Sequence, residues 1–168
     1  LKAGKWGTAA GEALGTYIAG PIGGLIGKIV GSAADKIFSG GAGTPHTGGY
    51  VLADASGGAT DITRQQGGIL NGDLQAAVKA IAVPLASALN DTAKVFGQTA
   101  AVSVRAVFEA DGHDASSALF HLLDASGKQL TGSYDAVSKL DSDPTKGFAQ
   151  FAEKSATAAR DYLQSINL

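Results

Sequence analysis

The chain of 168 residues contains no cysteine and no methionine. Without cysteine it has no disulfide framework, no thiolate metal site and no redox dithiol. Its 13 basic and 15 acidic residues give a formal net charge of −2, so it lacks the basic surplus that nucleic-acid binding requires. Because the chain opens at Leu1 and has no methionine, we expect a processed product or the C-terminal piece of a longer protein.

Large apolar side chains are also scarce, whereas the smallest residues are abundant. Leu, Ile, Val and Phe together make up 39 residues, about 23% of the chain, which is enough for a small core only. Of the 24 glycines, 19 lie up to Gly72, whereas nine charged residues lie up to that point and nineteen after it. This shift divides the chain into an apolar glycine-rich helical segment (1–38), a glycine-rich linker (39–70) and a small α+β domain (71–168).

The first segment repeats a small residue at every fourth position. In a helix these positions lie along one face, beside a ridge of the large aliphatic residues that precede several of them. Glycine costs about 1 kcal/mol relative to alanine in a helix, so the repeat predicts close packing against another helix as compensation. We expect a glycine-zipper helix, or a helical hairpin with a turn near Gly20-Pro21. The predicted helix-packing residues are Gly7, Gly11, Gly15, Ala19, Gly23, Gly27 and Gly31.

Two environments are open to this apolar segment. Residues 6–27 form a stretch interrupted by the single charge of Glu12, and its length is close to the roughly 20 residues that span a bilayer. Lys5, Trp6 and Lys28 stand at its ends, where such residues anchor a helix at a membrane interface. One interpretation is a membrane-inserting helix with these three anchors. The other is a helix bundle packed inside a soluble assembly.

The second segment is rich in signals for turns. A loop of this length inside a compact domain is unusual, so the stretch is predicted to be a flexible tether or a segment that docks on a partner. A short strand is expected within it at Tyr50–Leu52. The glycine pairs that mark turns or flexible joints lie at 40–41, 48–49, 57–58 and 67–68.

The third segment begins and ends with helical patterns. Apolar residues at helical spacing predict a helix from Asn71 or Asp73 to Phe96, bent or broken at Pro84. Near the C-terminus, Asp143-Pro144 predicts an N-cap followed by proline at the first helical position. The apolar stripe of this second helix is Phe148, Phe151, Ser155, Ala158, Tyr162 and Ile166.

Between these helices the period changes to that of strands. Alternation predicts strands over 102–108 and 118–123, followed by a turn at 124–127 and a third short strand over 128–131. The unit therefore reads as helix, antiparallel meander and helix. The expected fold class for the whole chain is α+β, mostly helical.

Candidate catalytic and metal-binding residues are few. Asp111, His113 and Asp114 share one tight loop, but an exposed hairpin turn has the same composition. His121 lies in a predicted strand and is expected to be packed rather than to act as a general base. Lys28 is followed by Ile29 where a phosphate-binding loop needs serine or threonine. We expect no enzyme activity, no metal site and no cofactor.

The composition and the repeat of the N-terminal part are similar to those of a known family. Residues 11–50 read GEALGTYIAGPIGGLIGKIVGSAADKIFSGGAGTPHTGGY. Together with a small C-terminal unit that ends in an amphipathic helix, this region resembles the C-terminal region of tail tape measure proteins, the long helical proteins inside the tail tube of long-tailed bacteriophages. The likeness rests on composition and repeat. The long heptads that set tail length in that family are absent, so the resemblance places the measuring part upstream of Leu1.

The resemblance implies a structural virion protein located inside the tail tube or at the tail tip. Copies of the chain, commonly three, would contact the distal tail and hub proteins. On infection the apolar helices would insert in the host inner membrane and help DNA to pass. Small residues allow helices to associate closely both in the tail and in lipid. No sequence-specific contact with nucleic acid is expected.

Two other classes of function fit the same residues. In the first, the chain is a structural adaptor whose glycine-rich arm threads through a partner and does not meet lipid. In the second, it is a secreted pore-forming toxin, in which the apolar helix is the active element and the α+β domain binds a receptor or an immunity protein. Lysis of cells by the isolated chain would separate the toxin from the tail protein.

Overall fold

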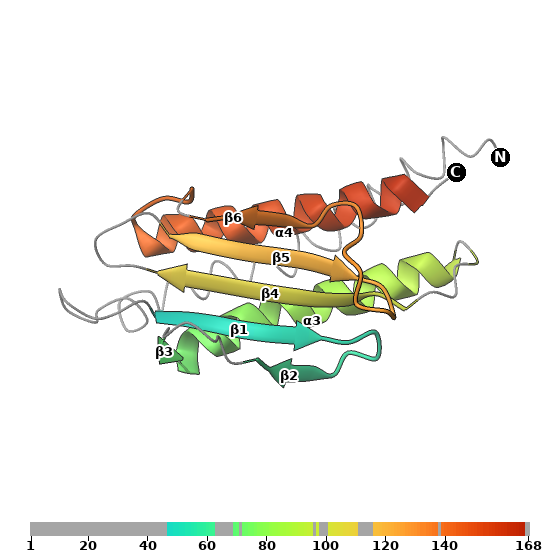
Figure 1. The fold of residues 1–168 in the computed structure, drawn as a ribbon, viewed down its shortest axis with the longest axis horizontal. Helices are drawn as coiled ribbons and strands as arrows, with labels where there is room; N and C mark the ends of the chain where they lie inside the picture. The colour runs from blue at the N-terminus through green and yellow to red at the C-terminus, as the bar shows by residue number, and fades with distance from the viewer. Residues whose placement is uncertain are drawn as a thin grey trace.

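The computed structural model of the chain describes residues 47–62, 69–70, 72–95, 97, 101–110, 116–137 and 139–166. The elements in these ranges are β1 (Thr47–Ala53), β2 (Ala59–Asp61), β3 (Ile69–Leu70), α3 (Gly72–Val95), β4 (Ser103–Ala110), β5 (Ser117–Leu123), β6 (Tyr134–Ala136) and α4 (Pro144–Ile166) (Figure 1). The predicted glycine-zipper helix lies outside the described residues.

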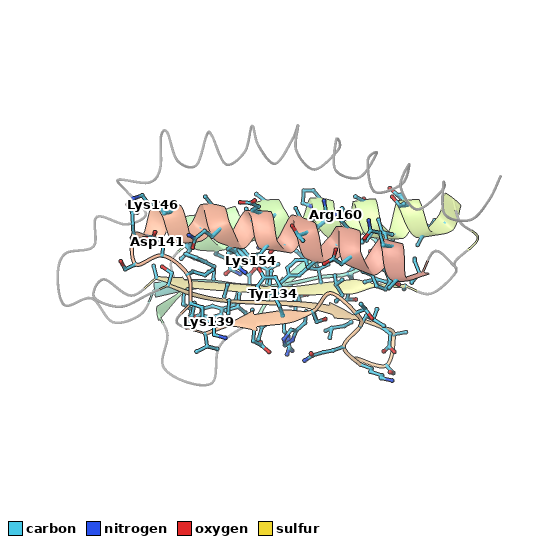
Figure 2. All side chains as sticks on the ribbon, turned by 90° about the horizontal axis from the view of Figure 1, so that it is seen from above. Tyr134, Lys139, Asp141, Lys146, Lys154 and Arg160 are labelled. Atoms are coloured by element: carbon cyan, nitrogen blue, oxygen red, sulfur yellow. The ribbon has the colours of Figure 1, made fainter. Side chains whose placement is uncertain are left out.

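The strands form one sheet in the order β2-β1-β4-β5-β6, in which every neighbouring pair is antiparallel. β3 joins this sheet as a parallel partner of β1. Both helices cover the same face of the sheet, α3 over β1 and β4, and α4 over β4 and β5 (Figures 1 and 2). The described residues thus form a two-layer α+β unit, and its sheet is larger than the three-stranded meander expected from the sequence.

The core lies between the two layers because alternate residues of the central strands point toward the helices. Phe108 of β4 is fully buried, and its ring centroid lies 5.2 Å from that of Phe148 and 5.7 Å from that of Phe151. Burial of a side chain of this size stabilises the fold by about 1.5–3 kcal/mol. The largest fully buried side chains are Phe108, Phe120, Phe148, Phe151, Leu74, Ile81, Leu85, Leu89, Leu122, Val51, Val78 and Val102.

The linker predicted over 39–70 is wrong for residues 47–61, which form β1 and β2. The short strand expected at Tyr50–Leu52 is present within β1, which pairs with β2 on one side and β4 on the other. A Cβ on Gly49 would lie 2.6 Å from the carbonyl oxygen of Leu74 in α3. The glycine at this position therefore lets a helix backbone approach the strand, and it does not serve as a flexible joint.

Of the bend or break expected at Pro84, the structure excludes the break, and the third strand lies elsewhere than expected. Pro84 does not break α3, which runs from Gly72 to Val95. A proline inside a helix costs about 3 kcal/mol, and the fully buried Ile81 and Leu85 beside it offset that cost. The third strand of the meander is β6 rather than 128–131, where Gln129 forms an isolated bridge with Leu123.

Three other expectations for this part of the chain are confirmed. The strand predicted at 102–108 is β4, which begins one residue later and ends two residues later, and the strand predicted at 118–123 is β5, which begins one residue earlier. α4 begins at Pro144, and Asp143 accepts a hydrogen bond from Gly147 N through its carbonyl oxygen at 2.8 Å. Local chemistry at a cap and alternation along a strand therefore predict these elements well.

Two turns of the sheet share the sequence Asp-Ala-Ser-Gly, at residues 54–57 and 124–127. In the first, Asp54 Oδ1 accepts hydrogen bonds from Ser56 N at 2.8 Å, Ser56 Oγ at 2.6 Å and Gly58 N at 3.0 Å. These three bonds close the turn, and they lower the pKa of Asp54 below its usual 3.8, with the Ser56 hydroxyl as the largest cause.

The second turn repeats this arrangement. Asp124 Oδ1 accepts hydrogen bonds from Ser126 N at 2.9 Å, Ser126 Oγ at 2.6 Å and Lys128 N at 2.9 Å. The pKa of Asp124 is lowered for the same reason, with the Ser126 hydroxyl as the largest cause. The glycines that end the turns have φ of 85° at Gly57 and 83° at Gly127, a conformation that glycine adopts without steric cost.

Candidate functional site

A groove of about 620 Å³ lies between the edge strand β6 and α4. Figure 2 shows Tyr134 and Lys154 between these two elements, with Lys139 beyond the end of β6. The α4 residues in its wall recur at helical spacing, because residues three or four apart share a face. The groove is lined by Gly132, Tyr134, Asp135, Ala136, Lys139, Gln150, Glu153, Lys154, Thr157, Ala158 and Asp161.

Tyr134 joins β6 to α4 inside the groove. Its hydroxyl donates a hydrogen bond to the carbonyl oxygen of Phe151 at 3.3 Å and lies 3.0 Å from Ser155 Oγ. Its ring stacks on Phe120 with a centroid distance of 5.9 Å. Burial raises the pKa of Tyr134 to about 12, so at neutral pH the phenol is uncharged and has a structural role.

Contacts between backbone and α4 bound the groove at both ends. At one end Gly132 has a φ of 98°, and a Cβ on it would clash with the carbonyl oxygen of Ala158. At the other end Gln150 Oε1 accepts a hydrogen bond from Asp141 N at 2.8 Å. Because each end is fixed to α4, the groove has a defined length along the helix.

Charged side chains of both signs line the groove. Lys154 Nζ lies 6.0 Å from the centroid of the Tyr134 ring, within the range of a cation–π contact. Neither Lys154 nor Lys139 forms an ion pair with any residue in the described ranges. Asp135 lies 3.0 Å from His121 Nε2 but keeps 55% of its side chain exposed. The two ammonium groups are thus available to a carboxylate from outside the unit.

On the other side of the sheet, side chains of α3 bond to β1 and β2. Gln75 Oε1 accepts a hydrogen bond from Tyr50 N at 2.6 Å, and Gln75 Nε2 donates to the Tyr50 carbonyl oxygen at 2.6 Å. Lys79 Nζ forms an ion pair with Asp61 Oδ1 at 2.7 Å. Hydrogen bonds from Lys79 and then Gln75 lower the pKa of Asp61. Gln75 therefore bonds the backbone of β1 at Tyr50, between the residues that pair with β3 and those that pair with β2, whereas the edge strand β2 is exposed.

Two polar clusters lie on the face of the sheet that points away from the helices. In one, the Tyr50 hydroxyl donates a hydrogen bond to Glu109 Oε1 at 2.7 Å. In the other, His121 is buried, with Asp135 on Nε2 and the Gln129 amide 3.3 Å from Nδ1. His121 is packed, as expected from the sequence. Both clusters join neighbouring strands, so their side chains have structural roles.

The site residues predicted from the sequence fall elsewhere in the chain. The helix-packing positions Gly7, Gly11, Gly15, Ala19, Gly23, Gly27 and Gly31, and the membrane anchors Lys5, Trp6 and Lys28, lie outside the described residues, as does the loop with Asp111, His113 and Asp114. Within the described ranges, no helix has the length and apolar character needed to cross a membrane. No group of three or more His, Asp or Glu side chains in those ranges is placed to hold a metal ion.

The groove residues were not singled out from the sequence. Gln150, Lys154, Thr157 and Asp161 lie beside the apolar stripe of α4 and read as an ordinary solvated face. The position of β6 at the sheet edge was hidden because the third strand was expected at 128–131. The recurrence of polar residues at helical spacing was the available signal, but it does not distinguish a groove wall from a free surface.

A scan against protein-family models, a search of curated proteins and a search of solved structures each gave no match to the chain.

Proposed function

We propose that the chain is a structural virion protein, the C-terminal part of a tail tape measure protein, located at the tail tip. It helps tail assembly and, on infection, membrane insertion and DNA passage. The likeness of residues 11–50 to that family supports the proposal. So does the combination, in one chain, of an apolar glycine-rich segment and a small folded unit.

The folded unit acts in this proposal by binding and not by catalysis. The observation that carries this role is the groove beside β6, where Lys139 and Lys154 form no ion pair with a described residue. Carboxylates outside the groove, such as Asp54 and Asp124, are engaged in closing turns. The partners proposed for the groove side of the unit are the distal tail and hub proteins.

The glycine-rich segment associates copies of the chain, three in this proposal. Its repeat, represented by Gly15 and Gly23, brings helices close together in the tail and later in lipid. Lys5, Trp6 and Lys28 anchor the helices at the membrane interface. Sedimentation of the full chain is expected to give a trimer that dissociates when Gly15 and Gly23 are both replaced by leucine.

Dye release from anionic liposomes by the full chain tests the membrane role. Release by the parent chain and not by the Gly15→Leu/Gly23→Leu variant supports the proposal. Absence of release from both proteins favours the structural adaptor. Equal dye release by the parent chain and the variant would show that the glycine repeat is not needed to disrupt the membrane. Lysis of intact cells by the isolated chain favours the pore-forming toxin.

A further inference from the structure

We propose that the groove beside β6 binds an extended segment of a different protein, which adds to the sheet as a strand next to β6. The segment carries a basic side chain opposite Asp135 and an acidic side chain on each side of that position. The inference rests on the proposed docking role of the folded unit and defines the chemistry of the partner.

The backbone of β5 shows which groups of β6 face the groove. Ser116 N donates a hydrogen bond to the Asp141 carbonyl oxygen at 3.3 Å, and Leu140 N donates to the Ser116 carbonyl oxygen at 3.1 Å. Leu130 N donates to the Leu122 carbonyl oxygen at 2.8 Å. In an antiparallel pair the backbone groups alternate between the two sides of a strand. The even-numbered residues of β5 therefore all direct their backbone groups toward β6.

The register then leaves one residue of β6 facing outward. Ala118 and Phe120 are the even-numbered residues of β5 that pair with β6, and their partners are Ala136 and Tyr134. Asp135 lies between those partners, so its N–H and carbonyl groups point away from β5 and toward the groove. An added strand engages a donor and an acceptor placed in this way.

The dimensions of the groove suit a short segment. The residues of α4 that line it run from Gln150 to Asp161, a length of about 16 Å at 1.5 Å per residue. An extended chain covers this length with about five residues. Turns at 131–132 and at 137 interrupt the strand on both sides of β6. Interruptions of this kind keep an edge from templating a longer sheet.

A second copy of this chain is a poor occupant. Two β6 strands related by a two-fold axis would pair through their outward-facing residue and would place Asp135 directly opposite Asp135. Like charges directly opposite each other in adjacent strands are destabilising. The edge therefore disfavours pairing with itself and favours a segment with a basic residue at that position.

Charged groups lie on both faces of β6. Tyr134 points toward α4, so Asp135 points to the other face, where its carboxylate remains 55% exposed. The partner residue opposite Asp135 points to that same face and meets the carboxylate with a lysine or arginine. Its neighbours point toward α4, where Lys154 and Lys139 line the groove. Glu153 and Asp161 also line this wall, so the preference for acidic or basic neighbours is decided by comparing two peptides of reversed charge.

The test uses the full chain and short peptides blocked at both ends. Fluorescein-labelled TVEKEVT is titrated by fluorescence anisotropy beside TVKEKVT and a version of TVEKEVT methylated on the lysine amide nitrogen. We expect the charge-reversed and methylated peptides to bind about tenfold more weakly or worse, which corresponds to about 1.4 kcal/mol. Hydrogen exchange is expected to slow at residues 134–136 when TVEKEVT is bound. Equal binding of the three peptides, or no binding of any, overturns the inference.

A pair of exposed cations on α4 provides matched variants. Lys154→Glu is expected to weaken binding of TVEKEVT about tenfold, whereas Arg160→Glu, which does not line the groove, changes it by less than about twofold. Melting temperatures report that both variants fold. An equal loss in the two variants overturns the assignment of the groove.

The outcomes separate this inference from the proposed function. If the full chain releases dye from liposomes and forms trimers but does not bind the peptide, the inference of strand addition is rejected and the proposed function as a tail protein stands. If the chain binds the peptide but neither releases dye nor forms trimers, the assignment of the groove as a binding site stands and the proposed function as a tail protein is rejected. Full-chain titrations with TVEKEVT and TVKEKVT therefore come first.

Discussion

The hairpins on the two sides of β4 are built on the same turn, yet they leave the sheet with two different edges. Asp54 and Asp124 each accept three hydrogen bonds at nearly equal distances. β1 and β5 are both antiparallel to β4, so the two turns leave the same end of the sheet (Figure 1). The turns therefore do not explain why the β2 edge is exposed and the β6 edge borders a groove.

The difference lies in the helices. On the β2 side, α3 sends Gln75 to the backbone of Tyr50 in β1 and Lys79 to Asp61 of β2. α4 instead contacts β6 through the Tyr134 hydroxyl and leaves Lys154 over the ring. The comparison teaches that the character of a sheet edge is decided by side chains from a distant part of the chain, and not by the turn that precedes it.

The largest expected effect comes from removing the hydrogen bonds of Gln75 to the backbone of β1. Gln75→Leu leaves the buried backbone groups of Tyr50 without two hydrogen bonds of 2.6 Å, so we expect a loss of about 3 kcal/mol in the free energy of unfolding. The matched variant Gln150→Leu removes one exposed bond to Asp141 N and costs less than about 1 kcal/mol. Urea unfolding measures both, and equal losses would contradict the comparison.

Alkaline pH tests the contact that holds β6 to α4. The folded pKa of Tyr134, about 12, lies above its usual 10.0. Its contribution is therefore fully present below pH 10 and is lost as the pH rises toward 12. Between pH 8 and pH 12 the wild type should lose about 2–3 kcal/mol more than Tyr134→Phe. Urea unfolding measures the free energy of unfolding at each pH. If it falls by the same amount in the wild type and in Tyr134→Phe, burial does not raise the pKa of the Tyr134 phenol.

The equivalence of the two turns is tested by their glycines. Gly57→Ala and Gly127→Ala each force a side chain into the left-handed region, where open space leaves backbone strain as the main cost. We expect each variant to lose about 1–2 kcal/mol. Thermal unfolding should show the two losses equal to within about 0.5 kcal/mol. A clear difference would mean that the turns are equivalent in geometry only.

The smallest effect is expected at acidic pH. Because the folded pKa values of Asp54 and Asp124 are lowered, their contribution is present above about pH 4 and is lost as the pH falls through the folded values. Asp54→Asn and Asp124→Asn should each reduce the fall in melting temperature between pH 7 and pH 2.5, by similar small amounts. Circular dichroism measures this fall, and an unchanged pH profile in either variant would exclude that turn as a cause.

Local signals predicted part of this fold correctly. Asp143-Pro144 marked the start of α4, and the alternation at 102–108 marked β4, because caps and strand periodicity depend on neighbouring residues only. β1 was assigned to a linker because the pair at 48–49 reads locally as a joint. The contact that requires a glycine at position 49 comes from Leu74, which is distant in the sequence.

The groove likewise depends on contacts between residues that are far apart in the sequence. Its walls are Gly132, residues 134–136, Lys139 and a face of α4, and no local pattern indicates that they meet. Gly132 separates 128–131 from β6 by adopting a φ of 98° against the carbonyl of Ala158. A site made by an edge strand and a helix needs the strand order of the sheet, and the strand order is a property of the whole unit.

The place of β1 in the sheet also determines how the unit responds to mechanical tension. β1 is the first described strand and yet lies beside β4, with seven residue pairs from Thr47↔Ala110 to Ala53↔Val104. Thr47 and the end of α4 lie at opposite ends of the unit (Figure 1). A pull between them runs along the strands and loads the β1–β4 bonds together in shear, rather than opening them one after another. Tension delivered through the backbone at Thr47 therefore meets the most resistant part of the sheet first.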